Sequence, residues 1–428
     1  MVDKDKLKDM GVATRALHAG WRSDPATGAF ALPIYETAGY EFRDTAYAAD
    51  LFALKEQGYI YSRLGNPTVA AFEEALASVE GGSSAVAVSS GQAAFTLLAM
   101  TLASSGDHIV AAKAVYGGTI TLLKNLFGRF GLQVDFVDFS HPCNVQAALR
   151  ENTRCIICEV IGNPAMNVAP IETVAGIARR EGIPFIVDNT FSPVVCRPFK
   201  WGADIVVHST TKYISGQGSA IGGAIVDSGN FDWGGDSRWT ALNAPDAAYH
   251  GVVFTEHFGR NALTAKIKTS TLRDVGACPS PFDCYLLRNA LGTLPLRMER
   301  HSSSALQVAG FLESHPAVVS VSYPGLASHP QYDLAKQYLE GGASGMMAFE
   351  LKGGYEAGVR FLDNMRVFAN VANVGDARSM ALHSASTTHS QLSPQERIAG
   401  GISEGMIRLS IGLEDPADLI ADLDEAMK

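Results

Sequence analysis

The segment Ile205-Val-Val-His-Ser-Thr-Thr-Lys212 contains the residue types that could form and hold an imine. An apolar run is followed by three consecutive hydroxyl residues, from Ser209 to Thr211, and then by Lys212. A lysine at the end of a buried strand has low-dielectric surroundings, which lower its pKa toward the neutral amine that imine formation requires. The hydroxyl groups could donate to a phosphate. Because a single lysine is more often a solvated surface residue, the rest of the chain must decide between these interpretations.

A carboxylate ends another apolar run upstream, in Pro184-Phe-Ile-Val-Asp188. A buried Asp normally needs a cationic partner. A protonated pyridine nitrogen is such a partner, and holding that proton on the ring makes the ring an electron sink. Alone, Asp188 could equally cap a helix or form a salt bridge at a strand end. Together with Lys212, it indicates a site for pyridoxal 5′-phosphate (PLP).

A turn that could bind a phosphate occurs at Ser90-Gly91-Gln92, between an apolar run over 85–89 and an amphipathic stretch over 92–103. The backbone N–H groups of Gly91 and Gln92 would lie at the start of a helix, where the helix dipole favours an anion. The motif alone is equally compatible with an ordinary capped turn.

The elements that would position these residues are short apolar runs that alternate with helical stretches. Residues 108–112, 155–160 and 185–187 read as buried strands, and 171–180 reads as one of the helices between them. This alternation predicts an α/β fold with a mostly parallel sheet and with chemistry at the carboxyl ends of its strands.

The rhythm of strands and helices divides the chain into three parts. We expect an N-terminal arm over 1–66 that contacts a neighbouring subunit, and a PLP-binding α/β domain over 67–284. An insertion interrupts that domain at about 227–270, where glycine and aromatic residues break the pattern. A long helix then leads into a smaller α+β domain over 285–428.

The composition, 47% hydrophobic and 18% charged residues, is that of an ordinary α/β protein. A net charge of −10 argues against a nucleic-acid or anionic-membrane surface. No apolar run reaches the roughly 18 residues that span a bilayer, and the start, MVDKDKLKDM, lacks the apolar core of a secretory signal. Cys155 and Cys158 would face opposite sides of a strand, so we expect core thiols and no metal site. These features predict a reduced, cytoplasmic protein.

Taken in order, the motifs resemble the Cys/Met-metabolism PLP-dependent enzymes, and the resemblance covers essentially the whole chain. This likeness implies PLP as cofactor and a large domain of the aspartate-aminotransferase type (fold type I). The motifs are Tyr61-Ser-Arg63-Leu-Gly-Asn66-Pro67-Thr68, Ser90-Gly91-Gln92, Tyr116-Gly-Gly-Thr, Asn163-Pro164, Asp188-Asn-Thr and Ser209-Thr-Thr-Lys212-Tyr.

The resemblance implies three catalytic residues. Lys212 would hold PLP as a Schiff base and move protons, Asp188 would pair with the pyridine nitrogen, and Tyr116 would stack on the ring. The phosphate would be held by residues of two subunits: Gly91, Gln92, Ser209 and Thr211 from one chain, with Tyr61 and Arg63 from its neighbour. A homo-oligomer with shared active sites follows, at least a dimer and usually a tetramer.

The resemblance also implies substrate-binding residues. Arg408, in Glu404-Gly-Met-Ile-Arg408-Leu-Ser, would fork onto the substrate α-carboxylate, as a planar bidentate donor can. By itself, an arginine there would more often form a surface salt bridge. Asn163 would assist near the carboxylate and the ring oxygen. Asn373, which the resemblance also places in the substrate site, stands where many relatives have Ser.

Within the family, the segment 227–270 and its Pro245-Asp-Ala-Ala-Tyr-His-Gly resemble the O-acetylhomoserine sulfhydrylase branch. We therefore expect a γ-replacement that turns O-acetylhomoserine and sulfide into homocysteine and acetate. A γ-lyase acting on methionine or cystathionine, or a cystathionine γ-synthase, is the alternative. A structural paralogue without PLP is disfavoured, because Lys212, Asp188 and both phosphate segments are present. The sulfur donor (free sulfide, methanethiol or a thiocarboxylated carrier protein), the acyl group and the choice between dimer and tetramer stay open.

Overall fold

The structure is a computed structural model that describes residues 4–387 and 403–428. Across these residues, a large sheet has seven strands in the order β1-β7-β6-β5-β4-β2-β3. Only β7 is antiparallel to its neighbours, β1 and β6. This confirms the expected α/β fold with a mostly parallel sheet. The strands are β1 (Ser84–Val88), β2 (His108–Ala112), β3 (Gln133–Val137), β4 (Thr153–Glu159), β5 (Phe185–Asp188), β6 (Ile205–His208) and β7 (Gly223–Asp227).

Helices connect these strands, and local sequence signals fix where the helices begin and end. The first long one begins at Pro67, where the Asn66 side chain accepts the N–H groups of Thr68 and Val69, and it ends at Gly81 in the left-handed conformation. Within the described ranges, no helix is both long and apolar enough to cross a membrane. The helices of this layer are α4 (Pro67–Glu80), α5 (Gly91–Leu102), α6 (Gly117–Thr121), α7 (Pro142–Ala148) and α8 (Ile171–Glu181).

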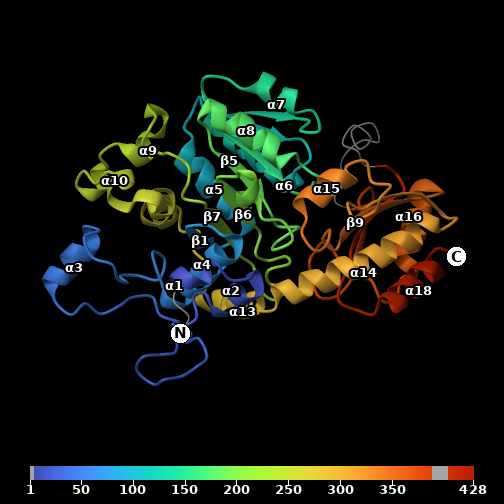
Figure 1. The fold of residues 1–428 in the computed structure, drawn as a ribbon, viewed down its shortest axis with the longest axis horizontal. Helices are drawn as coiled ribbons and strands as arrows, with labels where there is room; N and C mark the ends of the chain where they lie inside the picture. Colours follow the sequence, from blue (N-terminus) through green and yellow to red (C-terminus); the bar gives the residue numbers. More distant parts are fainter. Residues whose placement is uncertain (1–3, 388–402) are drawn as a thin grey trace.

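Two segments lie on the side of the large sheet that is remote from the C-terminal end of the chain (Figure 1). One is the N-terminal segment, in which α3 protrudes, and the other follows β7 and contains α9 and α10. They touch where the His257 ring nitrogen Nε2 lies 2.8 Å from the Leu54 carbonyl. Their helices are α1 (Lys4–Leu7), α2 (Val12–His18), α3 (Thr45–Phe52), α9 (Thr240–Asn243), α10 (Phe254–Phe258), α11 (Ala262–Lys266), the π-helix η7 (Ile267–Leu272) and α12 (Arg273–Val275).

The helix α14 (Leu294–Ser314) runs from the large layer, beside α13 (Pro281–Leu291), to a second domain (Figure 1). In the described part of that domain, the strands are ordered β10-β11-β12-β9-β8. This arrangement agrees with the α+β character expected there. The elements are β8 (Val318–Ser322), β9 (Met346–Leu351), β10 (Ala369–Asn370), β11 (Met380–His383), β12 (Met406–Ser410), α15 (Tyr332–Tyr338), α16 (Gly354–Asn364) and α18 (Pro416–Ala426).

A buried arginine of α14 connects this helix to the segment that follows Lys212. Arg297 donates hydrogen bonds to the carbonyls of Tyr213, at 2.5 Å, and Ile214, at 3.0 Å. Gly216 leaves room for the guanidinium, because a Cβ there would lie 2.3 Å from Arg297 Nη1. The long helix therefore fixes the backbone directly after Lys212.

Candidate active site

A cavity of about 350 Å³ lies at the carboxyl ends of the parallel strands. It brings together residues that are far apart in the sequence, because strand ends in a parallel sheet share one edge. Of the residues predicted for the site, only Tyr61 and Arg63 do not line it. The predicted residues in the lining are Gly91, Gln92, Tyr116, Asn163, Asp188, Ser209, Thr211, Lys212, Asn373 and Arg408.

Two carboxyl groups end neighbouring strands in this cavity. Glu159 ends β4, Asp188 ends β5, and the two residues are partners in the parallel register. Asp188 accepts the Thr190 backbone N–H at 2.8 Å. Burial raises the pKa of both groups; the Asp188 charge raises that of Glu159 further, while the Thr190 hydrogen bonds oppose the rise for Asp188. Neither carboxyl forms an ion pair with a cationic side chain in the described ranges.

The amine of Lys212 lies in the same cavity and contacts the second domain. Its Nζ donates to Asn373 Oδ1 at 2.6 Å. Burial, and then the positive charge of Arg408, lower the pKa of Lys212, because both disfavour the ammonium form. Arg408, on β12, donates to Asn163 Oδ1 at 3.1 Å. The amine, the guanidinium and the two amides therefore belong to one group of contacts that spans both domains.

The turn before α5 leaves donors and space at another end of the cavity. Ser90 caps the helix, and its Oγ accepts the Ala93 N–H at 3.1 Å. A Cβ on Gly91 would lie 2.8 Å from Ser209 Cβ, so a glycine allows the turn and the end of β6 to approach closely. Gln92 Oε1 is buried without a hydrogen-bond partner among the described residues.

These groups fit PLP. The turn offers backbone donors to a phosphate, the Lys212 amine could form an imine, and the carboxyl of Asp188 needs a cation such as a pyridinium. Hydroxyl groups complete the polar wall. Thr190 Oγ1 accepts the Ser209 N–H at 2.8 Å, and Thr211 Oγ1 accepts the Gly222 N–H at 3.0 Å.

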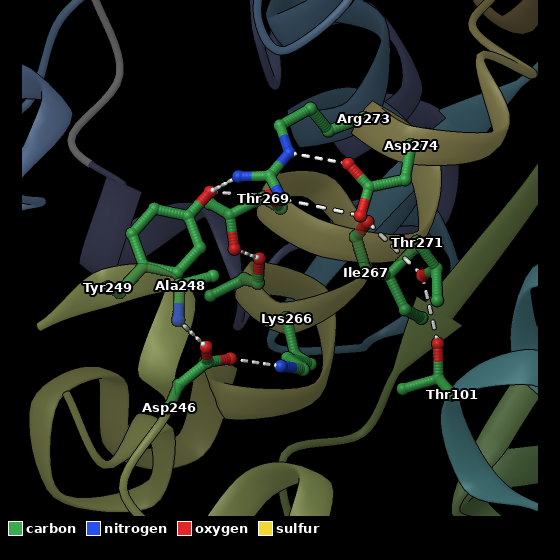
Figure 2. Close-up of polar contacts among 11 residues, drawn as sticks. Thr101, Asp246, Ala248, Tyr249, Lys266, Ile267, Thr269, Thr271, Arg273 and Asp274 are labelled. Atoms are coloured by element: carbon green, nitrogen blue, oxygen red, sulfur yellow. Dashed lines mark hydrogen bonds and ion pairs between the residues drawn. The ribbon is translucent and has the colours of Figure 1, made fainter. Parts of the chain in front are cut away.

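Tyr61 and Arg63 lie outside this cavity, beside the segment that follows β7. Arg63 donates to the Arg273 carbonyl, and its guanidinium lies 5.5 Å from the Tyr61 ring centroid. Figure 2 shows the polar contacts that hold Arg273: its guanidinium donates to Asp274 and to the Tyr249 hydroxyl, each at 2.7 Å. The Tyr249 hydroxyl in turn donates to the Thr269 carbonyl at 2.5 Å.

The structure adds lining residues that lie outside the quoted motifs, among them Glu159, Phe191, Ile221 and Val374. For Glu159 a signal was present, because it is a single carboxylate inside the otherwise apolar run from Cys155 to Ile161. The apolar residues gave no such signal, since their types are those of any core.

A lysine amine, a buried carboxyl and an anion-binding turn at the carboxyl ends of a parallel sheet define a PLP-dependent enzyme with an aminotransferase-like fold. The chain belongs to the family described as "Cys/Met metabolism PLP-dependent enzyme", whose model matches residues 13–428. The family therefore accounts for nearly all of the sequence, and it is the one that the motifs resemble.

Individual proteins are similar over the same length. The chain is 44% identical to an O-acetyl-L-homoserine sulfhydrylase of Leptospira meyeri (97% of this chain, 96% of the other). It is 45% identical to O-acetyl-L-homoserine sulfhydrylase 1 of Thermus thermophilus (98% and 100%). A crystal structure described as an O-acetylhomoserine (thiol)-lyase of Campylobacter jejuni aligns with a TM-score of 0.94 at 40% identity, over 98% of this chain and 100% of that one. That structure carries N′-pyridoxyl-lysine-5′-monophosphate.

The lowered pKa of Lys212 generates a prediction about cofactor capture by the apoenzyme. Capture needs the neutral amine, so its rate should rise with pH, with a midpoint below 10.5, the ordinary lysine value. Replacing Arg408 by Gln removes a like charge, and the midpoint should move upward. Stopped-flow absorbance after mixing apoenzyme with PLP at a series of pH values measures this shift. Arg300→Gln, at a partly exposed arginine that contacts Asp415, is the control. An unmoved midpoint in Arg408→Gln would contradict the assignment.

Proposed function

We propose that this chain catalyses a γ-replacement in the cytoplasm, in which O-acetylhomoserine and sulfide give homocysteine and acetate during methionine biosynthesis. The observation that carries the proposal is the full-length similarity to O-acetyl-L-homoserine sulfhydrylases, combined with a cavity that fits PLP. A homocysteine synthase of Schizosaccharomyces pombe, 45% identical over 97% of this chain, agrees with it. A γ-elimination from methionine or cystathionine needs the same residues, and the names of these similar proteins favour replacement.

PLP, when bound, withdraws electrons from the amino acid, so that its Cα and Cβ protons become acidic and a Cγ substituent can leave. The Lys212 amine takes the Cα proton and later returns one, a role supported by its lowered pKa. Asp188 keeps the pyridine nitrogen protonated. Lys212 then moves a proton off Cβ, acetate leaves Cγ with the bonding electron pair, hydrosulfide (HS⁻) forms the new C–S bond there, and the protons return to Cβ and Cα.

Residues of both domains hold the substrate in this proposal. Arg408 binds the α-carboxylate with two parallel hydrogen bonds, and its contact with Asn163 supports a fixed direction of the guanidinium. The 2.6 Å contact between Lys212 Nζ and Asn373 Oδ1 supports a role for Asn373 beside the reacting atoms. Tyr116 stacks on the ring and relays a proton to the leaving group.

The phosphate is held by Gly91, Gln92, Ser209 and Thr211 of one chain and by Tyr61 and Arg63 of a neighbour. Two observations support the contribution of Tyr61 and Arg63 to a neighbour's site. Both residues lie outside the cavity of their own chain, and Tyr61 is exposed. A phosphate dianion also favours a cation in addition to backbone donors, and a guanidinium forks onto it well. A homodimer, or a dimer of dimers, is the proposed assembly.

A substrate panel tests the proposed reaction. O-acetyl-, O-succinyl- and O-phosphohomoserine are each supplied with sulfide or methanethiol, beside methionine and cystathionine alone. We expect homocysteine from O-acetylhomoserine with sulfide at the highest kcat/KM. Lys212→Ala should lose that turnover without losing its fold, because it lacks both the imine and the proton carrier. Faster production of 2-oxobutanoate from methionine or cystathionine than of homocysteine would instead identify a γ-lyase.

The carboxylate of Asp188 generates a second prediction. Asp188→Asn should still bind PLP, but a neutral amide cannot hold the pyridinium proton. Losing several kcal/mol of electrostatic stabilisation should slow turnover on the order of a thousandfold or more. Single-turnover kinetics measures the slowed step, with Asp236→Asn as the control, at a half-buried residue outside the cavity that accepts the Arg238 N–H. A rate near that of the wild type would show that another residue supplies the charge.

Hybrid oligomers test the shared site. Lys212→Ala and Arg63→Ala protomers are each expected to be inactive. After unfolding and co-refolding of the mixture, some sites should combine an intact Lys212 with a neighbour's intact Arg63, and activity should reappear. Wild-type enzyme refolded in parallel shows that the protocol works. If the hybrids stay at the level of either parent, Arg63 serves the cavity of its own chain.

A further inference from the structure

Glu159 is a cavity residue for which neither the motifs nor the family resemblance supplied a role. It ends β4, is only 9% exposed, and lies beside Asp188 in the strand register. Its Oε1 accepts the backbone N–H of Tyr116 at 2.5 Å. Among the described residues, the Glu159 side chain makes this one hydrogen bond, and its carboxyl group forms no ion pair with a cationic side chain.

The hydrogen bond lies where the chain enters α6, from which the Tyr116 ring extends. The Tyr116 carbonyl accepts the Thr119 N–H at 2.8 Å, so the residue is held on both sides of its Cα. The ring itself lies over Gly118, since a Cβ there would be 2.4 Å from both Tyr116 Cε1 and Gln92 Nε2. Glu159 thus contacts the backbone of a residue that is 52% exposed and whose ring lies against Gly118, so the backbone contact and the missing Gly118 side chain together allow this ring position.

The contact needs an acceptor oxygen on Glu159 and does not need a charge. Burial, and then the Asp188 charge, raise the pKa of Glu159 well above its ordinary value, and the Tyr116 hydrogen bond opposes that rise. A protonated carboxyl group still accepts through its carbonyl oxygen. A glutamine amide has the same length and the same acceptor, so it should be able to replace Glu159.

We propose that Glu159 is a positioning residue that holds the Tyr116 backbone through its N–H and thereby fixes the Tyr116 ring in the cavity. This inference rests on the proposed function only for the part of the reaction in which Tyr116 takes part. The hydrogen bond itself can be tested without turnover.

The test compares Glu159→Gln, which keeps the acceptor, with Glu159→Met, which fills the same space without a good one. Amide hydrogen exchange of the peptide that contains Tyr116, followed by mass spectrometry in the holoenzyme, reports the hydrogen bond. Exchange should become about tenfold faster in Glu159→Met and stay at the wild-type rate in Glu159→Gln. The kcat should fall about tenfold only in Glu159→Met, with the KM for O-acetylhomoserine little changed.

A matched control lies at the opposite ends of the neighbouring strands. Asp204 Oδ2 accepts the Phe185 backbone N–H at 2.9 Å, and burial raises the pKa of Asp204 to about 6. Asp204→Leu should lower the melting temperature without altering Tyr116 exchange or kcat. If Glu159→Met fails to fold, Glu159→Leu also removes the acceptor and should show the same faster Tyr116 exchange and lower kcat.

The outcomes separate this inference from the proposed function. Equal losses in Glu159→Gln and Glu159→Met would overturn it, because the charge and not the acceptor would then matter. Unchanged Tyr116 exchange in Glu159→Met would also overturn it. A wild-type enzyme that makes no homocysteine would defeat the proposed function, whereas the exchange result would still decide whether Glu159 holds Tyr116.

Discussion

The carboxyl groups of Glu159 and Asp188 lie at the ends of neighbouring strands, inside the protein, with no cationic side chain paired to them among the described residues. Two such groups raise each other's affinity for a proton or a cation, because neither charge is solvated and like charges repel. Lys212 follows β6, which pairs with β5. Its charged ammonium form is disfavoured by burial and by the positive charge of Arg408. The pyridoxal ring of PLP could meet both requirements: its protonated nitrogen would offer the carboxyl groups a cation, and its aldehyde carbon would bind the neutral Lys212 amine.

This arrangement also explains why the site needs the second domain. The large sheet alone would leave the Lys212 amine without its 2.6 Å acceptor, Asn373, and the cavity without the Arg408 guanidinium. Both come from the region of the second sheet, and Arg297 connects the same two layers through the backbone that follows Lys212. The relative position of the domains therefore sets the distance between the amine and its acceptor. A shift between them would alter the cavity without changing any residue in it.

Much of this could be predicted from the sequence, because it depends on local patterns. The alternation of apolar runs and helices located most strands, and residues at the carboxyl ends of parallel strands must meet at one edge. The strand β7 (Gly223–Asp227) was not predicted, and it ends where the insertion was expected to begin, at about 227. The contact of Lys212 with Asn373 joins residues 161 apart, which no local pattern encodes. Glu159 was passed over because a strand-end carboxylate has many uses, and only its register with Asp188 distinguishes it.

The position of Arg63 depends on the segment that follows β7, because Arg63 donates to the Arg273 carbonyl there. A guanidinium has five N–H donors, and across the described residues Arg63 uses its hydrogen bond to the Arg273 carbonyl alone. That carbonyl is held indirectly, since the Arg273 side chain is fixed by Asp274 and by the buried Tyr249 (Figure 2). The contact directs one edge of the guanidinium to its own chain and leaves the other donors available. The segment around Tyr249 therefore governs where those donors point, and a change there would act on Arg63 without touching the cavity of its own chain.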